Sequence, residues 1–245
     1  MLALVTGSGR CGTNSVAAFL DGRRGMDGRR IAARHETEWQ EIVAALLDGR
    51  DDLADRRLGS MPHDIEVSPF LSLPRRRPLA DAGVKLVGVI RDGRKTVRSG
   101  MTNGWYWNPE RDPRHWVNLK PRLAGDRFEQ CCRFWAWTYL RLARWGADIF
   151  RLEDLAGGPA GRNRLLATLG LAPSNAPFPH RNPTEAPSRG AAPAEAAAAW
   201  PSPFPAADHW TAGQKRTFER HCGRVMDRYY PCWRETAAPG PSRPA

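Results

Sequence analysis

The first fifteen residues constrain the fold of this chain more than any other segment. An apolar stretch at residues 1–4 predicts a buried strand, and another at residues 16–20 predicts one face of a helix. Between them, residues 5–15 read Val-Thr-Gly-Ser-Gly-Arg-Cys-Gly-Thr-Asn-Ser. Glycines let the backbone approach a ligand closely, and the first N–H groups of a helix attract an anion. The segment therefore predicts an α/β fold whose first turn binds a phosphate-like group.

The position of the cation narrows the kind of phosphate site. A loop of the ATP-binding type reads Gly-x-x-x-x-Gly-Lys-Ser/Thr, with the lysine on the terminal phosphates. Gly7 and Gly12 have that spacing here, but Thr13 stands at the lysine position. The cation is Arg10, inside the loop. This pattern disfavours a P-loop-type nucleotide kinase or hydrolase, which remains the first alternative.

A second basic motif follows the clearest internal strand. Residues 84–90 are nearly all apolar and rich in β-branched side chains, which is typical of a strand buried on both faces of a parallel sheet. Arg91 comes directly after this strand, and Ser99 lies on the helix predicted to follow. Arginine holds a phosphate through two N–H groups, and a serine hydroxyl adds another bond. The motif therefore predicts a second phosphate site at the carboxyl edge of the sheet.

Together the two motifs resemble those of sulfotransferases that use 3′-phosphoadenosine 5′-phosphosulfate (PAPS). The first loop is similar to their 5′-phosphosulfate loop, Lys/Arg-Ser-Gly-Thr, with Cys11 in place of the serine. Residues 91–99 are similar to their 3′-phosphate motif, Arg-Asp-Pro-Arg-Asp-Val-x-x-Ser, with Gly93 in place of the proline. Residues 150–171 resemble a late segment of bacterial members. The resemblance covers residues 1–235 and implies a three-layer α/β fold with a mainly parallel central sheet.

The resemblance also implies which residues bind PAPS and its product 3′-phosphoadenosine 5′-phosphate (PAP). The implied cofactor-binding residues are Ser8, Gly9, Arg10, Cys11, Gly12, Thr13, Asn14, Ser15, Arg91 and Ser99. Arg10 is implied to be catalytic as well, because it would neutralise the charge that builds on the departing 5′-phosphate. Members of the family transfer the sulfuryl group to a hydroxyl or amine by in-line displacement, without a metal. Positioning and charge stabilisation dominate the analogous phosphoryl transfer.

The acceptor must lose a proton, and His35 with Glu36 is the predicted catalytic pair. The two residues come just past a short strand predicted at residues 29–34, where similar bacterial sequences often carry His-Glu. His35 titrates near neutrality without help, whereas Glu36 needs a raised pKa or acts by orienting the hydroxyl. Either residue qualifies as the base, and an acidic residue at a helix start is the alternative interpretation of Glu36. His63 and His115 are poorer candidates.

The rest of the chain is predicted to complete one domain over residues 1–235, followed by a disordered tail at 236–245. Periodicity predicts further helices at residues 38–47, 127–145, 163–169 and 211–229, and strands at residues 64–68 and 147–152. Thr211 is the predicted N-cap of the last helix. Glu153 and Asp154 are predicted to cap or pair. Residues 173–207, dense in proline and alanine, are predicted to form an extended wrap or a flap.

Aromatic residues after the second motif have two interpretations. Trp105, Trp107 and Trp116 either line an acceptor pocket or stack on adenine, or else they cover the sheet. The flap over the cofactor is predicted to include Arg181, Asn182 and Trp210. The acceptor itself is left open between a small molecule, a glycan, a lipid and a peptide, and so is the oligomeric state.

The charge of the chain raises two further alternatives. The formal net charge is +11, from 37 Lys+Arg against 26 Asp+Glu, and a basic surface attracts polyanions. The excess is mostly arginine in a chain rich in alanine, glycine and proline, which indicates a GC-rich genome more than a nucleic-acid partner. The alternatives are a non-catalytic basic protein that binds nucleotides or nucleic acid, and a family member that binds PAP without catalysis.

Cysteine usage and hydropathy predict a cytoplasmic protein. The five cysteines have no metal-ligand spacing, so we expect free thiols in a reducing compartment and no metal. No apolar run reaches the length of a membrane span. The first predicted strand starts at residue 2 with no basic segment before it, so no signal peptide is predicted.

Overall fold

A computed structural model of the chain describes residues 1–106, 123–180 and 204–235. Its main elements in chain order are β1 (Ala3–Thr6), α1 (Thr13–Leu20), β2 (Ala33–His35), α2 (Trp39–Leu47), α3 (Asp51–Gly59), β3 (Ile65–Val67), β4 (Lys85–Ile90), α4 (Gly93–Thr102), α5 (Arg127–Arg144), β5 (Asp148–Arg151), α6 (Leu152–Gly157), α7 (Pro159–Thr168) and α9 (Ala212–Tyr229). Short 3-10 turns lie at Pro69–Ser72, Ala80–Ala82 and Ala207–His209. The predictions for Trp107, His115, Trp116, Arg181, Asn182 and residues 236–245 lie outside the described residues.

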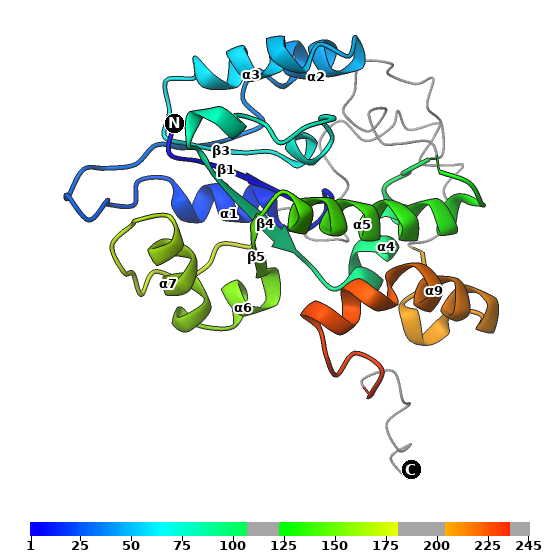
Figure 1. The fold of residues 1–245 in the computed structure, drawn as a ribbon. Helices are drawn as coiled ribbons and strands as arrows, with labels where there is room; N and C mark the ends of the chain where they lie inside the picture. The colour runs from blue at the N-terminus through cyan, green and yellow to red at the C-terminus, as the bar shows by residue number, and fades with distance from the viewer. Residues whose placement is uncertain (107–122, 181–203, 236–245) are drawn as a thin grey trace, which may run out of the picture.

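The five strands form one parallel sheet in the order β2-β3-β1-β4-β5 (Figure 1). Strand β1 pairs with β3 on one side and with β4 on the other. The chain therefore moves outward from β1 in one direction to reach β2, and in the other direction to reach β5. In such a sheet, ligands bind beyond the carboxyl ends of the strands where the order reverses. Both predicted phosphate motifs follow strands at this point, since one follows β1 and the other follows β4.

Helices cover both faces of the sheet, which confirms the predicted three-layer α/β fold (Figure 1). Successive residues of a strand point to opposite faces, so a strand between two helical layers is apolar throughout. Leu4 packs in the core under α2, α3, α5 and α9. Its neighbours Ala3 and Val5 pack in the opposite core, against α1 and α7. This double burial explains why β1 and β4 read as continuous apolar runs.

Several element boundaries differ from the predictions for local reasons. Strand β1 continues through Thr6, so the glycine loop begins at Gly7. Strand β2 begins later than predicted because Ile31 bonds back to the turn after α1: its N–H donates to Arg23 O at 2.7 Å, and its carbonyl accepts from Gly22 N at 2.9 Å. Helices α3 and α6 were not predicted. Helix α3 is mostly charged and buries only Ala54 and Leu58, so it carries little apolar periodicity.

The C-terminal helix begins as predicted, but the residue before its cap does not belong to a flap. Thr211 caps α9 by accepting from Gln214 N at 3.1 Å. Trp210 is only 4% exposed and packs edge-on against Phe128, with ring centroids 4.9 Å apart. The flap prediction for Trp210 is therefore wrong, because its indole fills the core between α5 and α9.

Two bulk properties of the described residues complete this picture. No helix among them is both long and apolar enough to cross a membrane. None of the five cysteines, which all lie in the described ranges, is in a disulfide bond, and Cys131 and Cys132 are fully buried in α5.

Candidate functional site

The glycine loop between β1 and α1 requires backbone conformations that side chains disfavour. Gly9, Arg10 and Gly12 have positive φ angles of 78°, 54° and 90°. A Cβ at Gly12 would lie 2.6 Å from Leu152 Cδ1, so close packing against α6 also excludes a larger residue. Arg10 is not glycine, and left-handed backbone at such a residue persists where the surrounding structure holds it. The loop is therefore a rigid turn that places the Arg10 side chain.

Tyr139 of α5 supports this loop from inside the protein. Its hydroxyl donates to Val89 O at 2.8 Å and lies 3.4 Å from the N atom of Ser8, which donates to it. Ser8 and Cys11 are fully buried, and burial raises the pKa of the Cys11 thiol. Of the predicted binding residues, Ser8 and Cys11 thus direct their side chains into the protein. The Ser8 N–H is also taken up by the Tyr139 hydroxyl.

The start of α1 has the arrangement of an anion site. The first helical hydrogen bond runs from Val16 N to Gly12 O at 3.0 Å, and the N-cap Gly12 has no side chain to cap the helix. A helix leaves its first N–H groups without helical partners, and these groups attract negative charge. The N–H groups of Thr13 and Asn14 belong to this first turn. They lie next to the left-handed backbone of the loop.

The two phosphate motifs meet through Arg10. Its Nε donates to Ser99 Oγ of α4 at 3.0 Å, and Nη1 of Arg91 donates to the Arg10 carbonyl at 3.2 Å. Burial, and then the charge of Arg91, lower the pKa of Arg10. Within residues 1–106, 123–180 and 204–235, no carboxylate forms an ion pair with Arg10. Neighbouring like charges of this kind are stabilised by an anion.

The remaining charges of the second motif are structural. Asp92 caps α4 by accepting from Arg94 N at 2.8 Å, and its other oxygen pairs with the Arg94 guanidinium at 2.6 Å. Arg94 also donates to the carbonyl of Trp233, at 3.0 Å. Although Arg94 matches an arginine of the family motif, it ties the C-terminal segment to α4.

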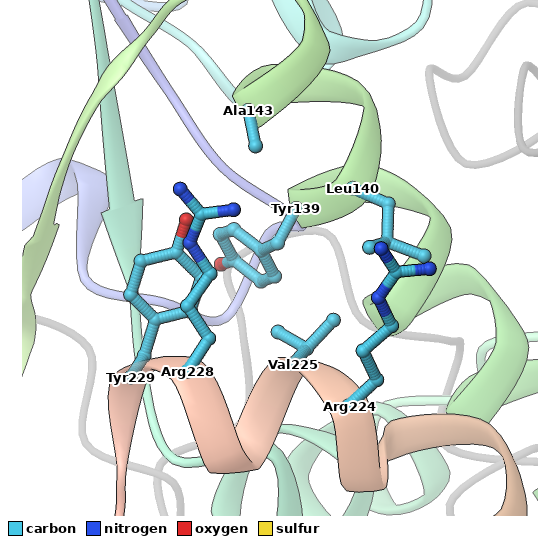
Figure 2. Close-up of a pocket in the computed structure, with 7 residues that line it drawn as sticks. All are labelled: Tyr139, Leu140, Ala143, Arg224, Val225, Arg228 and Tyr229. Atoms are coloured by element: carbon cyan, nitrogen blue, oxygen red, sulfur yellow. The ribbon is translucent and has the colours of Figure 1, made fainter.

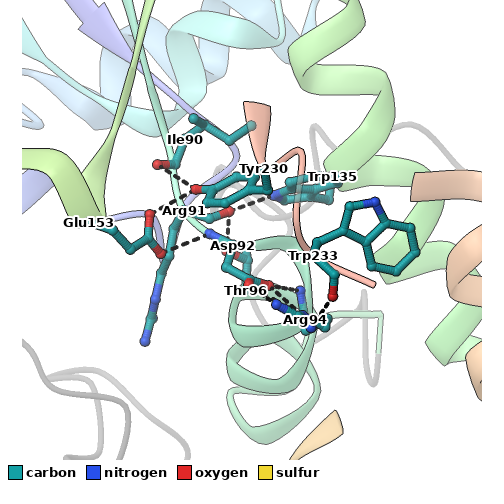
Figure 3. A network of polar contacts seen from close by, with 9 residues as sticks. All are labelled: Ile90, Arg91, Asp92, Arg94, Thr96, Trp135, Glu153, Tyr230 and Trp233. Atoms are coloured by element: carbon teal, nitrogen blue, oxygen red, sulfur yellow. Dashed lines mark hydrogen bonds and ion pairs between the residues drawn. The ribbon is translucent and has the colours of Figure 1, made fainter. Parts of the chain in front are cut away.

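A second set of contacts fixes the backbone at the end of β4 (Figure 3). Glu153 accepts from Asp92 N at 3.1 Å and from the Tyr230 hydroxyl at 2.8 Å, which confirms its predicted pairing role. Trp135 Nε1 donates to the Arg91 carbonyl at 3.2 Å. Figure 3 shows the Arg91 side chain extending away from these contacts. The network therefore anchors the main chain of Arg91 and leaves its guanidinium group on the side of the loop.

The predicted catalytic pair lies beside the same loop, at the end of β2. His35 Nε2 is 3.1 Å from Thr13 Oγ1, and its Nδ1 is 3.9 Å from Glu36 Oε2. Burial, followed by the charge of Glu66, raises the pKa of Glu36 to about 7, and burial lowers the pKa of His35. Near neutral pH, His35 is therefore uncharged, while Glu36 exchanges a proton readily. A pKa near the working pH is what general-base catalysis requires.

The sequence did not point to Glu66. This residue lies in β3, where all three residues are buried, and the pattern of residues 64–68 alone suggested an alternating strand. His63, which the sequence ranked low as a base, is also buried and lies against Glu66. The sequence did contain a sign of this buried carboxylate: Glu66 stands between two apolar residues of a strand, with His63 and Ser68 nearby as hydrogen-bond partners.

The described tryptophan of the aromatic cluster lies in the core. Trp105 is 3% exposed, and its ring meets Phe134 of α5 edge-on with centroids 5.6 Å apart. It also packs on Gly100 of α4, where a Cβ would lie 2.5 Å from Trp105 Cε3. Of the two interpretations, core packing is therefore the correct one for Trp105.

A separate pocket lies between α5 and α9. Its volume is about 220 Å³, and its lining residues are Tyr139, Leu140, Ala143, Arg224, Val225, Arg228 and Tyr229. Figure 2 shows these side chains directed toward one another from the two helices. None of the sequence-predicted site residues lines it.

Comparisons with known proteins give one solved structure. The chain is similar to a structure described as "Sulfotransferase Domain from the Curacin Biosynthetic Pathway", with 12% identity and a TM-score of 0.43, over 93% of this chain and 97% of that one. No protein-family model and no curated protein matches the chain. In the part of the chain that the structure describes, no group of three or more His, Cys, Asp or Glu residues is placed to hold a metal ion.

Proposed function

We propose that this chain is a sulfotransferase that moves a sulfuryl group from PAPS to a hydroxyl or amine of an acceptor. The observation that carries the proposal is the hydrogen bond between Arg10 and Ser99, at 3.0 Å, beside Arg91. It joins two phosphate motifs from distant parts of the sequence into one cationic site at the strand-order reversal. A donor with phosphate groups on both the 5′ and 3′ positions of its ribose fits such a bipartite site.

The residues of the site fall into two binding roles under this proposal. The donor, when bound, supplies a sulfuryl group on its 5′-phosphate. The loop backbone from Gly9 to Thr13 and the start of α1 hold the 5′-phosphate by N–H donation. Arg10 stabilises the charge that develops there, and Arg91 with Ser99 holds the 3′-phosphate. Asn14 and Ser15, in the first turn of α1, add side-chain bonds.

Glu36 is the proposed base, and His35 orients it. Glu36 has a pKa of about 7, so it takes a proton from an acceptor hydroxyl without a large energetic penalty near neutral pH. Burial lowers the pKa of His35, its Nε2 is held by Thr13 Oγ1 at 3.1 Å, and its ring lies beside the Glu36 carboxylate, with Nδ1 3.9 Å from Oε2. The acceptor is a small molecule, a glycan, a lipid or a peptide that presents its hydroxyl or amine to Glu36.

Nucleotide binding tests the donor assignment. The purified chain is titrated calorimetrically with PAP, with adenosine 5′-phosphate and with ATP plus magnesium. We expect PAP to bind more tightly than adenosine 5′-phosphate, because only PAP has the 3′-phosphate, and to raise the melting temperature. ATP–magnesium binding without affinity for PAP would establish the kinase alternative. The absence of any thermal shift at millimolar PAP would remove the donor assignment.

Product analysis tests the transfer itself. An extract of source-cell metabolites is incubated with PAPS and the chain, and mass spectrometry then detects compounds that gain the mass of a sulfuryl group. The matched control is Glu36→Gln, which keeps the shape of the side chain and removes the base. Sulfated products with the wild type and not with Glu36→Gln support the proposal, and equal yields contradict it. PAP binding without any product would define a non-catalytic binder.

A further inference from the structure

A buried acidic group lies behind the proposed base. Glu66 has 0% exposure, and its strand β3 stands between β2 and β1 in the sheet. A buried carboxylate destabilises the fold by several kcal/mol unless hydrogen bonds satisfy its oxygens. Glu66 contacts neither Arg10 nor Arg91 in any hydrogen bond or ion pair among the described residues. The partners of its two oxygens therefore show what the buried carboxylate does in the fold.

Both oxygens of Glu66 have partners, and these lead to the turn that carries Glu36. His63 Nε2 donates to Oε2 at 2.8 Å. Thr37 N donates to Oε1 at 3.2 Å, and the Ser68 hydroxyl donates to the same oxygen. The Ser68 oxygen in turn accepts from Glu36 N at 3.0 Å, and the Val67 carbonyl accepts from the same N–H at 3.3 Å. Glu66 thus holds the N–H of Thr37 directly, and through Ser68 it supplies one of the two acceptors of the Glu36 N–H.

The turn held in this way is strained. Glu36 has a φ of 54°, in the left-handed region that disfavours residues with a Cβ. Such a conformation is unfavourable by roughly 1–2 kcal/mol per residue and persists when neighbouring groups fix it. The paired N–H bonds to Ser68 and Glu66 supply that fixation. They determine where the Glu36 carboxylate lies relative to His35 and the loop.

We propose that Glu66 is a positioning residue for Glu36, which it acts on through Ser68 and the Thr37 N–H. The effect of Glu66 on turnover rests on the proposed function. Its effect on the position of Glu36 does not. The titratable groups that face Glu36 in the described structure are His35 from β2 and Glu66 from β3. The negative charge of Glu66 also adds to burial in raising the pKa of Glu36. Glu66 thus helps to fix the place of the proposed base and adds to the effect of burial on its proton affinity.

Two variants separate these effects. Glu66→Gln keeps the size of the side chain and one acceptor oxygen but removes the charge, whereas Ser68→Ala keeps the charge and removes the nearer acceptor of Glu36 N–H, leaving the Val67 carbonyl at 3.3 Å. Thr138→Val is the matched control, because it deletes a buried hydroxyl that bonds only to Phe134 O, at 2.9 Å within α5. Thermal denaturation checks that each full-length variant is folded.

The main readout is independent of activity. Carbon-detected NMR follows the titration of the Glu36 carboxyl, assigned with Glu36→Gln, and amide hydrogen exchange follows the N–H groups of Glu36 and Thr37. We expect Glu66→Gln to move the Glu36 titration to lower pH, because a like charge is removed. We expect Ser68→Ala to speed exchange at Glu36, because its N–H loses the nearer of its two acceptors and keeps only the longer bond to Val67 O. Thr138→Val changes neither.

Kinetics supply the second readout. Turnover near neutral pH falls about tenfold in Glu66→Gln and its acid limb moves to lower pH, while PAP affinity stays at the wild-type value. An unchanged Glu36 titration in folded Glu66→Gln overturns the inference. If Glu66→Gln does not fold, unchanged exchange at Glu36 in Ser68→Ala overturns it. If the NMR changes occur in a chain that binds no PAP, the positioning role stands and the proposed function fails.

Discussion

The candidate site has a cationic half and an acidic half that are built in different ways. The cationic half is the glycine loop with Arg10 and Thr13, which follows β1, together with Arg91 at the end of β4 and Ser99 of α4. The acidic half is His35 and Glu36 at the end of β2, with Glu66 behind them in β3. The halves touch where His35 Nε2 meets Thr13 Oγ1 at 3.1 Å. One half is arranged to hold an anion, and the other to exchange a proton.

The two halves differ in the effect of burial and like charge on the pKa of their main ionisable group. In the cationic half, burial and a like charge lower the pKa of Arg10, which favours binding of an anion that relieves the repulsion. In the acidic half, burial and a like charge raise the pKa of Glu36 to about 7, which favours proton uptake. The same physical causes thus act on the proposed binding group on one side and on the proposed base on the other.

The largest expected effect is on turnover in the acidic half. Glu36→Gln should lower kcat by about 10²–10⁴, the usual contribution of a general base, with PAP affinity unchanged. His35→Gln should lower kcat less, because it removes an orienting contact and leaves the base in place. Steady-state kinetics and calorimetry of both variants make the measurement. Full activity in both single variants would falsify the assignment of the base to this half.

The next effect is on binding in the cationic half. Arg91→Ala should weaken PAP binding by about 10–100-fold, because it removes hydrogen bonds between charged groups. Binding of adenosine 5′-phosphate should change little, since that ligand lacks the 3′-phosphate. Arg98→Ala is the matched control, because Arg98 lies on the same helix and donates to Phe204 O at 2.9 Å. Equal losses for both nucleotides would move Arg91 to the 5′ end of the ligand.

The third expected effect is a gain in the free energy of unfolding when Glu36 is replaced. The folded pKa of Glu36 lies above its usual value, so the neutral form stabilises the fold and this stabilisation is lost as pH rises from about 4.5 through about 7. Glu36→Gln, which is neutral throughout, should be more stable than the wild type by on the order of 2 kcal/mol at about pH 8 and equal to it at about pH 4. Denaturant unfolding at both pH values measures this, with Glu38→Gln, an exposed neighbour, as the control. A lower stability of Glu36→Gln at the higher pH contradicts the raised pKa.

The smallest expected effect comes from one hydroxyl. Ser99→Ala should weaken PAP binding by roughly fivefold, the value of one hydrogen bond of about 1 kcal/mol. Because Ser99 and Arg91 act on the same phosphate, their combined variant should lose less affinity than the two separate losses predict. A double-mutant cycle by calorimetry measures this coupling. Strict additivity would place the two residues on different parts of the ligand.

The cationic half was predictable from sequence because each of its motifs is contiguous. Gly7 to Thr13 form a turn between an apolar strand and a helix, and Arg91 directly follows a strand buried on both faces. Strand ends of a parallel sheet share one edge, so local sequence sufficed to bring the motifs together. The specific bond between Arg10 and Ser99 required the structure, because side-chain directions do not follow from spacing.

The acidic half was only partly predictable because the residues that hold Glu36 come from a neighbouring strand, β3, and not from β2 itself. The pair His35 and Glu36 was found from the sequence, but Glu66 was not, since its burial depends on β1 and β2 covering both sides of β3. Trp210 was misassigned for a similar reason: its neighbours are rich in proline, whereas its position is set by Phe128 on a distant helix. Local sequence patterns did not reveal the contacts between segments that lie far apart in the sequence.

The buried thiol of the phosphate loop has a practical consequence for handling this protein. Cys11 is fully buried and its pKa is raised, so the reactive thiolate is scarce and reagents cannot approach it. Cys232, near the C-terminus, is exposed. Maleimide dyes and mild oxidants should therefore modify Cys232 first and leave the loop intact. A fluorophore can be attached there by a single coupling, with no need to replace the other cysteines.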